Sequence, residues 1–355
     1  MGQADADVSG IASLMDLASA RLGGRALIAT DDFFAGKENL LKPGRAIFIA
    51  DKFTERGKWM DGWESRRKRG PGHDWCIIAL GRPGLVRAVL VDTGHFNGNQ
   101  PEACTVEGAA LPTAADEASL TGPGIAWMPL VPQTPLGPDR EHVIPSLPGA
   151  AGQRFTHVRL NIFPDGGVAR FRAFGEVLPD WTAPAKPGDL IDLAAAENAG
   201  LVIASNNMHF GSCHNLIMPG RALNMGDGWE TRRKRGLKGG EFDWTIVRLG
   251  RRGTVSKVEV DTNHFKGNFP ESCMIETADA PPQPGTPDGH GKAFQPQDVA
   301  WRVLLPRTPL SADTRHFFEE QLDRAAASNP CTHARLSIFP DGGISRLRLL
   351  GTVST

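Results

Sequence analysis

Residues 156–174 read T-H-V-R-L-N-I-F-P-D-G-G-V-A-R-F-R-A-F, and this stretch decides the fold. Val158, Leu160 and Ile162 alternate with polar residues, which is the period of a strand with one buried face. The P-D-G-G segment supplies a tight turn, and the apolar residues after it return as a second strand. The sequence therefore predicts an antiparallel β-hairpin here.

The same pattern recurs near the end of the chain, where residues 334–350 read A-R-L-S-I-F-P-D-G-G-I-S-R-L-R-L-L. Two further motifs are also written twice. The first motif is D-G-W-E-[ST]-R-R-K-R-G, at residues 61–70 and 227–236. The second motif is D-T-x-H-F-x-G-N-x-P-E, at residues 92–102 and 261–271. We call R-L-x-I-F-P-D-G-G the third motif.

A repeat of this length indicates two copies of a whole domain rather than a short solenoid unit. The chain has 355 residues, which also favours two domains. We place the first copy at residues 15–178 and the second at residues 190–355. Each copy contains many short strand patterns separated by Gly/Pro turns, which predicts an all-β protein of two tandem antiparallel sandwiches.

Four further strands are expected, and helical patterns are few and short. The strand patterns lie at residues 75–80, 86–92, 244–249 and 255–261. The helical patterns lie at residues 16–22, 192–198 and 316–327. Because no G-x-G-x-x-G follows a strand, a dinucleotide-binding domain is not expected.

Composition narrows the class of protein. The formal net charge is −1, which argues against a nucleic-acid-binding protein. The five cysteines are an odd number without a C-x-x-C, so neither a disulfide framework nor a zinc knuckle is indicated, and we expect Cys104 and Cys273 to be buried. No secretory signal or membrane-spanning stretch is evident, so we expect a cytoplasmic protein without a membrane partner.

The first motif places carboxylates beside arginines. Arginine binds a carboxylate with a planar fork, and a neighbouring acid can move a proton. We assign proton transfer to Glu64 and Glu230. The remaining candidates are expected to bind substrate: Asp61, Trp63, Arg66, Arg67, Asp227, Trp229, Arg232 and Arg233. The structural alternative is a solvated turn with internal salt bridges, but the near-identity of the two copies favours function.

The second motif adds His95, Asn99 and Glu102 in the first copy, and His264, Asn268 and Glu271 in the second. Histidine carries protons near neutral pH, and an asparagine amide can both donate to and accept from a urea-like group. We therefore expect the histidines and glutamates to be catalytic and the asparagines to bind substrate. A purely structural turn is the alternative. No cofactor is required, although Asp, His and Glu leave a divalent metal as an option.

The strand pattern that follows the third motif carries an R-x-R pair, Arg170/Arg172 and Arg346/Arg348, which either anchors an anion or pairs with neighbouring acids. The copies differ at residues 29–36 and 204–211, where Asp31 and Asp32 align in sequence with Asn206 and Asn207. No G-x-S-x-G is present, and no cysteine is marked as a nucleophile, so a serine or cysteine hydrolase is not indicated.

Together, the three duplicated motifs closely resemble the allantoicase family, whose members are built from two allantoicase repeats. The resemblance covers nearly the whole chain from about residue 15. It implies jelly-roll domains of the galactose-binding-like kind, and a homo-oligomer. It also implies hydrolysis of allantoate to ureidoglycolate and urea in purine (allantoin) catabolism, a reaction of the hydrolases that cleave C–N bonds of linear amidines.

The residues suit that substrate. Allantoate carries one carboxylate and two ureido groups on a single carbon, so arginines suit the carboxylate and Asn or acid side chains suit the ureido groups. An acid–base route needs no covalent nucleophile. The main rival is a non-catalytic tandem jelly-roll protein that binds a sugar or another ligand.

Overall fold

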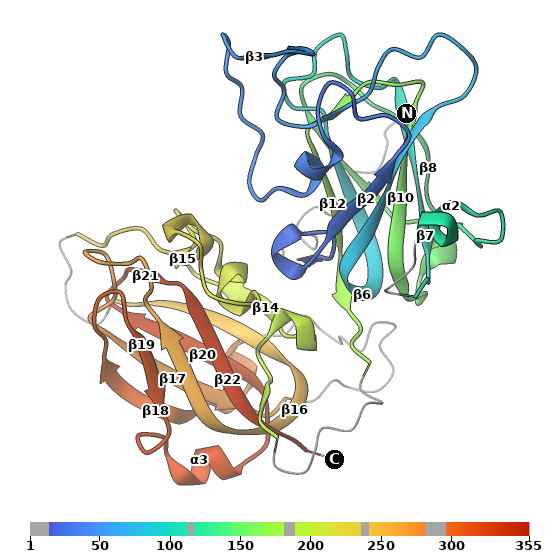
Figure 1. The fold of residues 1–355 in the computed structure, drawn as a ribbon. Coiled ribbons are helices and arrows are strands. Elements are labelled where there is room, and N and C mark those ends of the chain that lie inside the picture. The colour runs from blue at the N-terminus through green and yellow to red at the C-terminus, as the bar shows by residue number, and fades with distance from the viewer. Residues whose placement is uncertain (1–13, 113–116, 181–188, 236–240, 281–295, 355) are drawn as a thin grey trace. The chain divides into compact units, whose positions relative to one another are not determined.

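In the computed structural model, the structure describes residues 14–112, 117–180, 189–235, 241–280 and 296–354. The chain divides into two compact units, Met1–Pro179 and Asp180–Thr355, and each is an antiparallel β-structure (Figure 1). Within the described ranges, no helix is long and apolar enough to cross a membrane.

The strands of the first unit are β1 (Met15–Asp16), β2 (Arg25–Ala29), β3 (Phe53–Thr54), β4 (Gly57–Lys58), β5 (Trp63–Glu64), β6 (Asp74–Asp92), β7 (Ala103–Ala109), β8 (Met128–Pro135), β9 (Glu141–Pro145), β10 (Phe155–Phe163), β11 (Gly167–Val168) and β12 (Arg170–Val177). Its helical turns are η1 (Ala20–Leu22), η2 (Lys37–Leu41), α2 (Glu117–Thr121) and η3 (Pro148–Ala150).

The strands of the second unit are β13 (Ile191–Asp192), β14 (Leu201–Ser205), β15 (Trp229–Glu230), β16 (Asp243–Asp261), β17 (Ser272–Ala278), β18 (Arg302–Pro309), β19 (Arg315–Phe318), β20 (Cys331–Phe339), β21 (Gly343–Ile344) and β22 (Arg346–Val353). Its helical turns are η4 (Ala196–Asn198), η5 (Cys213–Ile217), η6 (Met225–Asp227), η7 (Pro296–Asp298) and α3 (Arg324–Ser328).

One long strand joins the two layers of each sandwich. The first half of β6 pairs with β2 and β10, and its second half pairs with β9 and β12. The two strands expected at residues 75–80 and 86–92 are therefore halves of one strand. In the second unit, β16 pairs in the same way with β14, β20, β19 and β22, and its curvature is visible in Figure 1. This is the jelly-roll sandwich that the repeats predict.

The hairpin predicted from the third motif is wrong, although both of its strands exist. β12 does not pair with β10; it pairs with β1 and with the second half of β6. The P-D-G-G turn therefore crosses between the layers. Gly167 makes this crossing possible, because a Cβ there would lie 1.9 Å from the ring of Phe96. The second copy repeats the geometry, with Gly343 against Phe265 at 2.0 Å.

The apolar half of the predicted alternation is correct, but the opposite face of β10 is not exposed, since His157 and Asn161 are also buried. Val158, Leu160 and Ile162 in β10 are fully buried, as are Leu336 and Ile338 in β20. All five cysteines are free and buried, including Cys104 and Cys273, as expected. These side chains behave as small apolar parts of the core.

The helical expectations were mostly wrong. Residues 16–22 and 192–198 form a short strand followed by a single 3₁₀ turn. In residues 316–327, only the C-terminal part is helical, in α3. Residues 315–318 instead form β19, which pairs with residues 258–261 of β16. Sheet pairing across the fold overrides the local helix pattern there.

Candidate active site

The three repeated motifs meet at one end of each sandwich. In the first unit, β5 pairs with β11, so that Glu64 lies opposite Gly167. The Gly167 N–H donates to the carbonyl of Asn99 at 2.8 Å, and the Asn99 side-chain amide donates to the Glu64 carboxylate at 2.8 Å. One residue from each motif thus lies in a single hydrogen-bonded group.

The second unit repeats this group around a cavity of about 790 Å³. Glu230 lies opposite Gly343, whose N–H donates to Asn268 at 2.8 Å, and the Asn268 amide donates to Glu230 at 2.7 Å. Of the predicted site residues, the cavity brings together Glu230, Arg233, Asn268 and Glu271. Its other lining residues are Phe210, Thr231, Arg235, Gly267, Phe269, Pro309, Leu310, Pro340, Asp341 and Gly342.

Successive side chains of the R-R-K-R segment lie on opposite sides, which is the alternation of an extended chain. Arg233 and Arg235 line the cavity, whereas Lys234 between them points inward to the buried Asp243. The first copy has Lys68 in the same place, 2.8 Å from Asp74. Period-two alternation could have identified Arg235, and its counterpart Arg69, as partners of Arg233 and Arg67.

Arg66 and Arg232 are directed elsewhere. The guanidinium of Arg66 forms a two-pronged ion pair with Asp31, at 2.7 and 2.6 Å, and the Arg66 N–H also donates to that carboxylate. In the second copy, the Arg232 N–H donates to the Asn207 side chain at 3.3 Å. Arg232 is not among the residues that line the described cavity.

These contacts correct the alignment of the stretch in which the copies differ. Asp31 corresponds to Asn207, because the carbonyl of each accepts the indole N–H of the first-motif tryptophan, Trp63 or Trp229. The alignment by sequence is therefore shifted by one residue. A single acid, Asp31, is exchanged for an amide at this position.

Four predicted substrate-binding residues are buried. Trp63 and Trp229 have no exposed surface, and Asp61 and Asp227 are 7% and 2% exposed. Asp61 pairs with the buried Arg170 at 2.6 Å, and Asp227 pairs in the same way with Arg346 at 3.0 Å. Burial contradicts direct contact between these four residues and a substrate. The R-x-R arginines accordingly pair with acids and backbone carbonyls.

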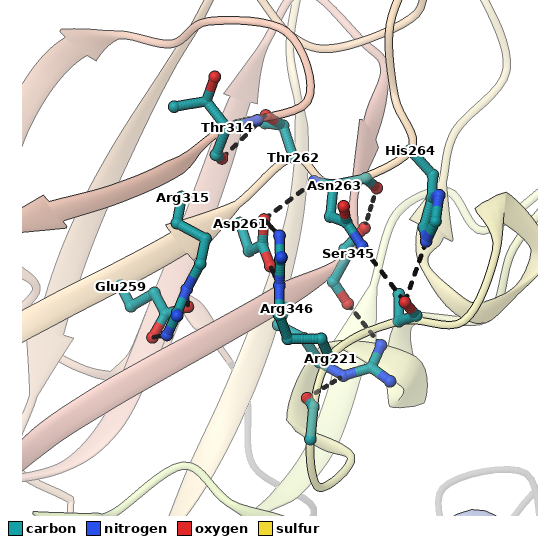
Figure 2. Close-up of polar contacts among 12 residues, drawn as sticks. Arg221, Glu259, Asp261, Thr262, Asn263, His264, Thr314, Arg315, Ser345 and Arg346 are labelled. Atoms are coloured by element: carbon teal, nitrogen blue, oxygen red, sulfur yellow. Dashed lines mark hydrogen bonds and ion pairs between the residues drawn. The ribbon is translucent and has the colours of Figure 1, made fainter.

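The two histidines hold loops in place. His95 and His264 have left-handed backbones, with φ of 67° and 71°. The Nε2 of His95 lies 3.1 Å from the carbonyl of Ala46, and the Nε2 of His264 lies 3.0 Å from that of Ala222. Figure 2 shows His264 and Asn263 directed at this same carbonyl. His264 is not among the residues lining the cavity.

The adjacent turn carries further polar contacts. Arg221 forms an ion pair with the buried Asp261 at 3.1 Å, and Asp261 also accepts the Asn263 N–H at 3.0 Å (Figure 2). The Ser345 N–H donates to the Asp261 carbonyl at 2.7 Å, which ties the end of β16 to the start of β22. These bonds fix the loop that leads to Asn268.

The last glutamate of the second motif differs between the copies. Glu271 forms an ion pair with Arg307 at 2.8 Å and accepts the Ser272 hydroxyl. These hydrogen bonds hold the pKa of Glu271 below its ordinary value. Glu102 is exposed. By strand register, Gln133 takes the place of Arg307 in the first copy.

Burial raises the pKa of Glu64 above its ordinary value, and the hydrogen bond from Asn99 opposes that shift. A carboxyl with a raised pKa, held beside an amide, keeps its proton to higher pH than a free glutamate does and is therefore suited to donate it. The part of the chain that the structure describes contains no group of three or more His, Cys, Asp or Glu residues that could hold a metal ion.

Sequence reasoning missed several residues of this loop end. Besides Arg235, the cavity is lined by Asp341 of the P-D-G-G turn and by Phe210 and Phe269. The duplication of Asp341 as Asp165 is visible in the third motif, where the P-D-G-G pattern predicts only a turn. Phe210 is duplicated as Phe34, because the N–H of each donates to the carbonyl of the first-motif glutamate, whereas Gln100 stands at the place of Phe269.

Fold and site together define a protein of two tandem jelly-roll domains, each with carboxylate, amide and arginine side chains at one loop end. Residues 15–178 and 191–354 each match the allantoicase repeat that defines the allantoicase family. The chain belongs to the allantoicase family.

Similar proteins agree with this assignment. The chain is 47% identical to "Probable allantoicase 1" of Burkholderia mallei, over 96% of this chain and 94% of that protein. It is 43% identical to the allantoicase of Dictyostelium discoideum, over 96% of this chain and 87% of the relative. The crystal structure of allantoicase from Saccharomyces cerevisiae superposes with a TM-score of 0.80 at 31% identity, covering 99% of both chains.

Proposed function

We propose that this protein hydrolyses allantoate to ureidoglycolate and urea, and so serves purine (allantoin) catabolism. The observation that carries the proposal is the meeting of all three motifs at one cavity of about 790 Å³ in a member of the allantoicase family. Its lining combines two arginines, one amide and three carboxylates, the groups that suit a small anion with ureido arms.

In the proposed binding mode, Arg233 and Arg235 receive the substrate carboxylate. The side-chain amide of Asn268 already donates one N–H to Glu230. In this binding mode, the oxygen of the same side-chain amide accepts a ureido N–H. In the first copy, Arg67, Arg69, Asn99 and Glu64 take the same roles. Asp61, Trp63, Asp227 and Trp229 support the site from beneath, without touching the substrate.

In the proposed reaction, Glu230 or Glu64 donates a proton to the leaving ureido nitrogen, and that C–N bond breaks to release urea. The lone pair of the remaining ureido nitrogen forms a C=N bond to the central carbon. Water then adds its oxygen to this carbon while a carboxylate, Glu271 or Glu102, accepts the proton, and the second nitrogen regains its lone pair. No covalent intermediate with the enzyme is formed.

The test is urea release from allantoate by the purified protein, with and without a chelator. We expect wild-type protein to release urea, and Glu64→Gln or Glu230→Gln to lower kcat by about 10²-fold to 10⁴-fold in whichever copy is catalytic. Loss of urea with chelator would assign a metal to the reaction. If no urea forms but allantoate raises the melting temperature, the protein is a binding module instead.

We extend the proposal to compartment and assembly. Five free, buried cysteines suit a reducing cytoplasm, and family membership favours a homo-oligomer. Light scattering coupled to gel filtration tests the assembly. A mass equal to one 38.2 kDa chain at every protein concentration would contradict it.

A further inference from the structure

We propose that Lys234 and Asp341 are positioning residues that hold Arg233 and Arg235 toward the cavity. In the first copy, Lys68 and Asp165 hold Arg67 and Arg69 in the same way. This inference rests on the proposed function, in which the two arginines bind the substrate carboxylate. It concerns two residues in each copy that do not themselves bind that carboxylate.

The first contact fixes the backbone between the arginines. The Lys234 N–H donates to the Asp341 carboxylate at 2.6 Å, and the Lys68 N–H donates to Asp165 at 2.7 Å. A hydrogen bond to an ionised acceptor is shorter and stronger than a neutral one. The aspartate of the P-D-G-G turn thus holds the arginine segment at its central residue.

The second contact fixes the side chain of the same residue. Lys234 forms an ion pair with Asp243, and Lys68 forms one with Asp74 at 2.8 Å. Both aspartates are 1% exposed and begin the long strands β16 and β6. An unpaired carboxylate buried this deeply would be strongly destabilised, so the lysine is held inward.

With its middle residue held at both backbone and side chain, the segment cannot rotate about its own axis. Since side chains alternate in an extended chain, Arg233 and Arg235 must then share the opposite side. Two forks fixed in advance lose less entropy when they bind an anion than two free surface arginines would. Both anchors recur in both copies, as expected if the arrangement serves the site.

The experiment measures KM and kcat for allantoate in Lys234→Met, Asp341→Ala and Asp341→Asn. The matched first-copy set is Lys68→Met, Asp165→Ala and Asp165→Asn, and Arg235→Ala and Arg69→Ala identify the copy that binds substrate. In that copy, we expect the Lys→Met and Asp→Ala variants to raise KM about tenfold and to leave kcat within about threefold of the wild-type value. The asparagine variant keeps an acceptor for the lysine N–H, so its KM should stay near the wild-type value.

Lys234→Arg and Lys68→Arg separate positioning from loss of folding, because arginine keeps the cation and should restore KM. The proposal is overturned if the Lys→Met and Asp→Ala variants keep the wild-type KM while Arg235→Ala or Arg69→Ala raises it. It is also overturned if Asp→Asn and Asp→Ala raise KM equally. If Arg235→Ala and Arg69→Ala both leave KM unchanged, the proposed site for the substrate carboxylate is wrong, and the positioning role is overturned together with it.

Discussion

The side-chain amide of Asn268 donates a hydrogen bond of 2.7 Å to the carboxylate of Glu230, and Asn99 makes the same bond to Glu64 at 2.8 Å. These residues are 38 and 35 positions apart in the chain. The pair joins the first motif to the second in both copies. It therefore holds an acid and an amide side by side at the loop end of each unit.

The first prediction concerns the two sides of the arginine segment. We expect Arg233→Ala and Arg235→Ala to raise KM about tenfold to a hundredfold, because each removes a charge-assisted hydrogen bond to the substrate carboxylate. Arg232→Ala is the matched control and should change KM little, since Arg232 does not line the cavity. Steady-state kinetics test this. Equal effects from all three variants would show that alternation does not govern binding.

The second prediction concerns the acidity of Glu64. The bond from Asn99 favours the ionised carboxylate, so Asn99→Ala should raise the pKa of Glu64 further above its ordinary value. The protonated acid would then persist to higher pH, and any limb of the pH–rate profile that Glu64 controls should move upward. Carbon-13 NMR of labelled glutamate, with Glu64→Gln to assign the signal, measures the pKa directly. A downward shift contradicts the prediction.

The third prediction concerns the histidines. His264 and His95 are held in a left-handed conformation and bonded through Nε2 to backbone carbonyls. Asparagine tolerates that backbone, so we expect His264→Asn and His95→Asn to keep kcat within about tenfold of the wild-type value. Direct proton transfer by either histidine would instead lower kcat by about 10²-fold or more, and rate measurements distinguish the two roles.

The fourth prediction concerns the buried pair Asp61 and Arg170. Removing one partner leaves a buried charge uncompensated, so Asp61→Ala should lower the free energy of unfolding by about 3–5 kcal/mol. Denaturant unfolding followed by tryptophan fluorescence measures this. The protein that remains folded should bind allantoate with its ordinary KM. A raised KM at unchanged stability would restore Asp61 as a substrate-binding residue.

Much of the fold could be predicted from sequence, because strand burial follows a local period. The alternation of Val158, Leu160 and Ile162 needs only one apolar face, and the duplication needs no structure at all. The glycines of P-D-G-G marked a sharp turn. Gly167 is also needed because the ring of Phe96 packs closely against it. Phe96 lies 71 positions away in the sequence, so this need cannot be seen from the local pattern.

The sequence alone determined that there are two copies of one β-domain, and which polar residues to consider. Only the tertiary structure decided that the P-D-G-G turn crosses between layers rather than closing a hairpin. It also decided that Trp63 lies inward and that Lys234 turns away from the cavity, which leaves Arg233 and Arg235 facing it. Each β-strand can pair with many others that are distant in sequence, and the side on which a residue lies follows from which strands pair. Residue types can be read from the sequence, but the face that each presents is fixed only when the sheets close.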